Sequence, residues 1–214
     1  MNRHRWAALA ALTTITLAAC GGGGGNEPTA AEGQVADPGA TVASASIARN
    51  MEELEETLDI SVPEGYERAP DSIGDTGPSD LEKAVRDDGA ADARDVLTRT
   101  RFVRGYQRMW TGASEDDEIV AYVYQFADTA GALEYTNRLN TGILTPPEGV
   151  TVTPFDVPNI HAAAGANIAE PNFASSSITF VKGPYSVQMV VSGTKPTGLE
   201  SLATALAEEQ YSRL

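Results

Sequence analysis

Arginines and aromatic side chains gather in one stretch of the chain, where they could bind a ligand. Arg94, Arg99, Arg101, Arg104 and Arg108 fall within the fifteen positions from 94 to 108. In "FVRGYQRMW", the alternation of an extended strand puts every second side chain on the same face. Guanidinium forks beside aromatic rings suit a small anionic, sugar or peptide ligand. The candidate binding residues are therefore Arg104, Tyr106, Arg108 and Trp110, with Tyr122 and Tyr124 expected on the neighbouring strand.

The overall charge supports a second interpretation of the same residues, in which they stabilise the fold and bind no ligand. The chain has 15 basic and 30 acidic side chains. Without Arg3 and Arg5, which precede Cys20, the balance is 13 − 30 = −17. An acidic protein tends to place arginines against its own carboxylates, and aromatic residues on strands usually belong to the core. So negative a balance also argues against nucleic acid as a partner.

The remaining residues give no pattern typical of a catalytic or metal site. His161 is the only histidine after His4, and no G-x-S-x-G, H-E-x-x-H or Walker-type sequence occurs. An EF-hand alignment beginning at Asp71 places Ile73 at a ligand position and Thr76 at the turn glycine. We therefore expect no catalytic residue, no metal and no cofactor. Carboxylate pairs have no spacing signature, so a carboxylate-dependent envelope hydrolase or transferase stays open as an alternative.

The N-terminus has the layout of an export signal. Arg3 and Arg5 precede an apolar stretch that is too short to span a bilayer comfortably, and the stretch ends at the only cysteine. Leu17-Ala18-Ala19-Cys20 resembles the lipobox of bacterial lipoproteins, which implies that Cys20 carries a lipid. We expect a signal peptide over 1–19, a flexible lipid-attached linker over 20–46 that is poor in large apolar residues, and a single folded domain over 47–214.

The spacing of apolar residues in 47–214 predicts an α+β fold. Helices are expected over 47–58, 79–85 with Ser79 as the cap, 90–98, 129–139 after Asp128, and 197–214. Strands are expected over 102–110, 119–126, 150–153, 164–169, 176–181 and 185–192. We therefore predict an antiparallel sheet of hairpins packed by helices on one face, with the other face partly open.

Three strand motifs suggest a family for the folded part. The sequences "R-x-W" at Arg108, "VYQF" at Val123 and "G-x-Y-x-V-Q" at Gly183 resemble those of uncharacterised lipoproteins from high-GC Gram-positive bacteria. The resemblance itself implies no activity. The lipobox, the flexible linker and the absence of a catalytic pattern favour a non-catalytic ligand- or partner-binding domain, held at the extracytoplasmic face of the cell membrane by the lipid on Cys20. A structural or assembly accessory that docks to another envelope protein is a further alternative.

Overall fold

A single antiparallel sheet of eight strands organises the protein. The computed structural model describes residues 47–73, 76–114 and 116–214, so the predicted signal peptide, Cys20 and the predicted linker lie outside the described residues. The strand order is β1-β3-β4-β8-β7-β6-β5, and β2 pairs with β3 beside β1. The strands are β1 (Glu67–Arg68), β2 (Gly77–Ser79), β3 (Phe102–Thr111), β4 (Glu118–Phe126), β5 (Thr151–Phe155), β6 (Ala164–Glu170), β7 (Phe173–Lys182) and β8 (Tyr185–Gly193).

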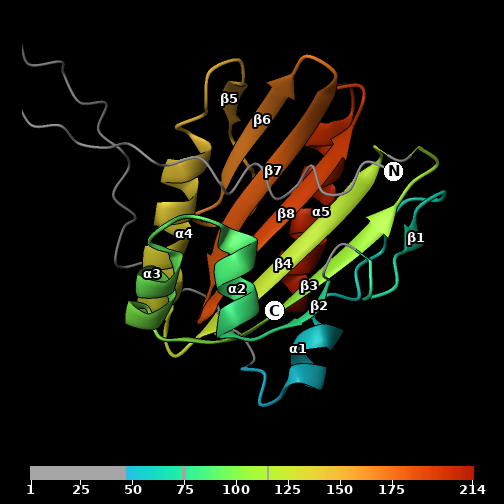
Figure 1. Ribbon diagram of the computed structural model, residues 1–214. Coiled ribbons are helices and arrows are strands. Elements are labelled where there is room, and N and C mark those ends of the chain that lie inside the picture. Colours follow the sequence, from blue (N-terminus) through green and yellow to red (C-terminus); the bar gives the residue numbers. More distant parts are fainter. Residues whose placement is uncertain (1–46, 74–75, 115) are drawn as a thin grey trace, which may run out of the picture.

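Helices cover both faces of this sheet. They are α1 (Met51–Glu56), α2 (Leu81–Asp88), α3 (Ala93–Arg99), α4 (Thr129–Ile143) and α5 (Leu199–Arg213). Figure 1 shows α2, α3 and α4 in front of the sheet and α5 behind it. The α+β class and the antiparallel hairpins are confirmed. The expectation of helices on one face is corrected, because the apolar stripes of α4 and α5 pack on opposite faces.

Strand alternation produces an apolar core on each face of the sheet, and a small third cluster consists of Ala69, Met109 and Val120. Behind the sheet, α1 and α5 pack on Tyr185, Val187, Met189 and Val191 of β8. In front, α2, α3 and α4 pack on Tyr124 and Phe126 of β4. Successive side chains of a strand point to opposite faces, so β4 and β7 contribute to both cores. The front core is the smaller of the two and lies toward one end of the sheet.

Capping residues define the ends of two of the front helices. Asp128 caps α4 as predicted, because its carboxylate accepts a hydrogen bond from the Gly131 amide at 2.9 Å. The predicted cap of α2 is corrected: Asp80 accepts from the Lys83 amide at 2.8 Å, and Ser79 belongs to β2. Gly89, with φ +69°, ends α2 in the left-handed conformation that glycine adopts readily.

Candidate functional site

A groove of ≈ 340 Å³ lies on the front face, between α4 and the sheet. Its lining residues come from β4, β8, β7, β6 and β5, which are neighbours in the sheet. Four steps between strands span roughly 19 Å at the usual spacing of about 4.8 Å. The groove therefore extends across much of the sheet, and it occupies the part of the front face that α2 and α3 leave uncovered in Figure 1.

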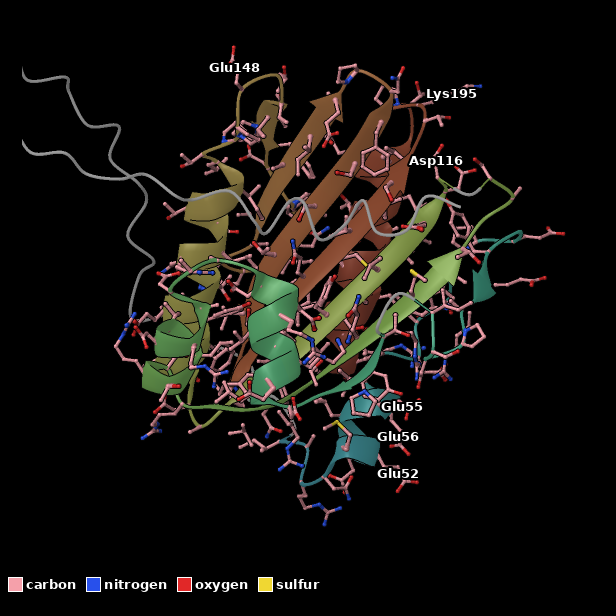
Figure 2. All side chains as sticks on the ribbon, viewed as in Figure 1. Glu52, Glu55, Glu56, Asp116, Glu148 and Lys195 are labelled. Atoms are coloured by element: carbon pink, nitrogen blue, oxygen red, sulfur yellow. The ribbon has the colours of Figure 1, made fainter. Side chains whose placement is uncertain are left out.

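The wall of the groove is aliphatic. It is formed by the second half of α4, the loop that follows it, and the two outer strands β5 and β6. In Figure 2, Glu148 marks the tip of that loop, at the upper end of the molecule. The apolar lining residues are Leu139, Ile143, Pro146, Pro147, Val150, Val152, Ile168 and Val190. Such a wall with a few polar groups opposite is typical of small-molecule sites.

The floor of the groove is polar and uncharged. Ser175 and Ser177 of β7 share the front face with Ser186 and Gln188 of β8, and the register places Ser175 opposite Ser192 and Ser177 opposite Val190. The Gln188 Nε2 atom donates to the Ser177 Oγ atom at 3.1 Å. Ser175 is 2% exposed, and within the part of the chain that the structure describes its Oγ has no hydrogen-bond partner. A buried hydroxyl without a partner is costly, so this atom is available to a bound molecule.

At its lower end the groove meets a hydrogen-bonded network centred on Asp87. The Asp87 Oδ2 atom accepts from the Lys83 Nζ atom at 2.6 Å and from the Tyr124 hydroxyl at 3.3 Å. Lys83 also donates to the Gln107 side chain at 3.0 Å, and Gln107 donates to the Tyr122 hydroxyl at 3.1 Å. The charge of Asp87 is therefore already balanced by a buried lysine.

Asp88, the next residue of α2, is engaged in the same way. Its Oδ2 atom accepts from the Arg138 Nη1 atom at 2.6 Å and from the Tyr135 hydroxyl at 3.1 Å. Carboxylates at the C-terminal end of a helix face the negative end of its dipole, so cations are needed beside them. Asp87 and Asp88 line one groove, but both are held in ion pairs with α2 or α4.

The tyrosines at this end stay protonated over the physiological range. Burial raises the pKa of Tyr122, Tyr124 and Tyr135, and the carboxylates of Asp87 and Asp88 raise it further. The phenols therefore act as hydrogen-bond donors and as apolar surface. The arrangement can bind and orient a molecule, and it offers no proton-transfer group with a pKa near neutrality among the lining tyrosines.

Three of the predicted binding residues lie in the rear core instead. Tyr106, Trp110 and Arg108 are buried behind the sheet, where α1 packs on β3. The Arg108 side chain donates to the Leu58 carbonyl at 3.0 Å and to Glu55 Oε1 at 2.7 Å. This guanidinium connects the segment around α1 to the sheet, so it serves the fold.

The structure divides the six predicted residues between two faces. Tyr122 and Tyr124 pair with Gln107 and Gly105 in the register of β3 and β4, so they point forward, away from Tyr106. Arg104 is half-buried on the rear face and interacts electrostatically with Glu53. The four candidate residues of β3 share one face, which the segment around α1 largely covers, whereas Tyr122 and Tyr124 on the neighbouring strand point to the other face. Only Tyr122 and Tyr124 line the groove.

The other arginines of the cluster pair with nearby carboxylates, as the second interpretation expected. Their partners are Glu82 for Arg94, Glu134 for Arg99 and Asp128 for Arg101. These pairs are at least half exposed and stabilise little. They leave no free guanidinium cluster for an anion around Arg94, Arg99 and Arg101.

Sequence reasoning missed the groove, although β7 and β8 carried a signal for it. A central strand that is covered on both faces usually has a continuous run of apolar residues in its sequence. Here "ASSSITF" places Ser175, Ser177 and Thr179 on one face of a central strand, and β8 adds Ser186 and Gln188 to that face. Small polar residues at alternate positions on two central strands indicate a face that is not filled by core side chains.

His161 is exposed, and residues 47–73, 76–114 and 116–214 contain no group of histidine, cysteine or acidic side chains placed to hold a metal ion. Among the helices of the same ranges, none has the length and apolar character needed to cross a bilayer.

Comparison with known proteins gives a structural likeness at low sequence identity. No protein-family model and no curated protein matches the sequence. The fold is similar to the crystal structure of the extracellular domain of PknH from Mycobacterium tuberculosis, with a TM-score of 0.46 and 9% sequence identity. The alignment covers 77% of this chain and 92% of that chain. A likeness at this level transfers no function.

Proposed function

We propose that this protein is a lipid-anchored, extracytoplasmic binding protein whose ligand occupies the groove between α4 and the sheet. The observation that carries the proposal is the groove itself, with its aliphatic wall and uncharged polar floor. Its volume of ≈ 340 Å³ is within the usual range of small-molecule sites. The lipid anchor rests on the sequence around Cys20, and it would hold the binding site near the membrane surface.

The network at the end of the groove supports binding over catalysis. An enzyme that uses two carboxylates needs one of them free to give or take a proton. Asp87 and Asp88 are instead bonded to Lys83, Arg138 and two tyrosines. These bonds make the end of the groove rigid, which favours a preformed site.

Titration with decan-1-ol, followed by calorimetry, tests the proposal. The full chain carrying Cys20→Ser avoids detergent and has no acylation site. Gly142 lines the groove, and a Cβ atom there meets nothing within 4 Å. A Gly142→Trp side chain should therefore enter the groove and abolish the heat of binding without disturbing the core.

The matched control adds the same indole to the same helix outside the groove. Leu133 on α4 is 40% exposed and is not a lining residue. Leu133→Trp should bind decanol like the parent chain. Equal binding by the two tryptophan variants, or no binding by the parent, would show that the groove is not the site.

A further inference from the structure

The charge around the groove selects against anions. None of the described residues that line it is Lys or Arg, whereas Asp87, Asp88 and Glu170 are among them. Lys83 and Arg138 offset the two aspartates, so neither cation is presented to a ligand. Glu170 is exposed at the end of β6, and the whole chain carries a formal charge of −15. A carboxylate in the groove would lose hydration and gain no cationic partner.

The extent and the lining of the groove favour an aliphatic chain as its ligand. Its ≈ 340 Å³ extends across five neighbouring strands. Leu139, Ile143 and Ile168 supply branched aliphatic surface along its side, which suits a methylene chain.

The floor selects a polar group that accepts and donates hydrogen bonds. The Ser175 Oγ atom is buried and has no partner among the described residues. Ser177 accepts from Gln188, which leaves its own hydroxyl hydrogen available, and Tyr122 accepts from Gln107 in the same way. Ester oxygens and alcohol hydroxyls match these groups without bringing charge.

We infer that the ligand of the groove is a neutral, single-chain acyl compound of the monoacylglycerol type, with its ester and hydroxyl groups over Ser175, Ser177 and Gln188. The inference rests on the proposed function and adds the chemical class of the ligand. The fatty acid of the same chain length is the molecule that the site rejects. The aliphatic wall contributes affinity to both, and the polar floor distinguishes them.

Calorimetric titration of the full chain carrying Cys20→Ser with monodecanoylglycerol and with decanoate tests the inference. Both probes have the same chain and are used as monomers at neutral pH. The ester should bind at least about tenfold more tightly, because the ionised carboxylate is desolvated without a partner. Equal or tighter binding of decanoate overturns the inference, and so does the failure of both probes to bind. The proposed function stands in either case if decanol binds and Gly142→Trp prevents it.

Ser175→Ala tests the floor directly. In the free protein this change removes an unpartnered buried hydroxyl, so stability should stay the same or rise. Affinity for monodecanoylglycerol should fall about fivefold through the loss of one hydrogen bond, and decanol should be less affected.

Ser79→Ala is the control for Ser175→Ala. Ser79 is also a fully buried serine whose Oγ has no partner in the described ranges, but it belongs to β2 and does not line the groove. Its substitution should leave the affinity for the ester unchanged. If the two alanine variants bind the ester equally, the assignment of the polar floor is wrong.

Discussion

At the scale of single residues, the buried charges serve the fold. Arg108 is 6% exposed, and its side chain bonds to Leu58 and Glu55 near α1. The sequence showed its alternation with Tyr106 and Trp110 correctly. It could not show that the α1 segment, far away along the chain, covers the face on which they lie, because that contact depends on long-range packing.

Arg108→Ala should lower the free energy of unfolding by about 1–3 kcal/mol, since it leaves the buried Leu58 carbonyl without its donor, whereas Glu55 keeps its ion pair with Arg68. Urea denaturation measures the change. Arg49→Ala, which breaks a pair between Glu53 and a side chain that is 85% exposed, should cost under about 1 kcal/mol. Binding of decanol should survive Arg108→Ala, and a loss of binding in a folded variant would contradict the division between the two faces.

Alkaline pH should destabilise the protein through Tyr106. Burial, followed by the hydrogen bond to Asp71, raises the pKa of Tyr106 from 10.0 to about 12. A phenol whose pKa is higher in the folded state contributes its full stabilising free energy at pH values below its pKa in the unfolded state. That stabilisation is lost as the pH rises through its pKa in the folded state. The melting temperature should therefore fall between about pH 10 and 12. Tyr106→Phe should show a shallower fall, and an identical pH profile for the two proteins would refute the assignment.

At the scale of elements, local patterns predicted most of the secondary structure. The strands that form hairpins, the Asp128 cap and the apolar stripe of the last helix were all readable from spacing. The arrangement of helices on the two faces of the sheet could not be predicted in this way. An apolar stripe shows that a helix has a buried face, but it does not show which face of the sheet the helix contacts. The groove depends on that layering, so only its polar floor left a mark in the sequence.

The contact between α4 and the turn before β3 positions the wall of the groove. A Cβ atom at Gly131 would lie 2.2 Å from the Thr100 carbonyl oxygen, so only glycine fits there. Gly131→Ala should therefore lower the free energy of unfolding by about 2 kcal/mol or more. Gly142→Ala, in the same helix with open space around it, should raise it by about 0.5–1 kcal/mol. Thermal unfolding of both variants measures the difference, and equal shifts would contradict the close packing of α4.

At the scale of the whole molecule, the account joins a membrane anchor to a binding groove. If Cys20 carries the lipid, Cys20→Ser removes the site to which the acyl chains are bonded. The protein should then move from the membrane fraction to the soluble fraction, because those chains provide its attachment to the bilayer. Fractionation followed by immunoblotting measures the shift. A variant that stays with the membrane to the same extent, with its leader still removed, would contradict the anchor.

The most direct test of the central claim is a methyl NMR titration of the full chain carrying Cys20→Ser with decan-1-ol. Val190 of β8 lines the groove, whereas Val187 and Val191 point to the rear core. The account predicts that the methyl signals of Val190, Leu139, Ile143 and Ile168 shift with a common saturation curve while those of Val187 and Val191 hardly move. Shifts centred on Val187 and Val191, or no saturable shift at the groove, would contradict it.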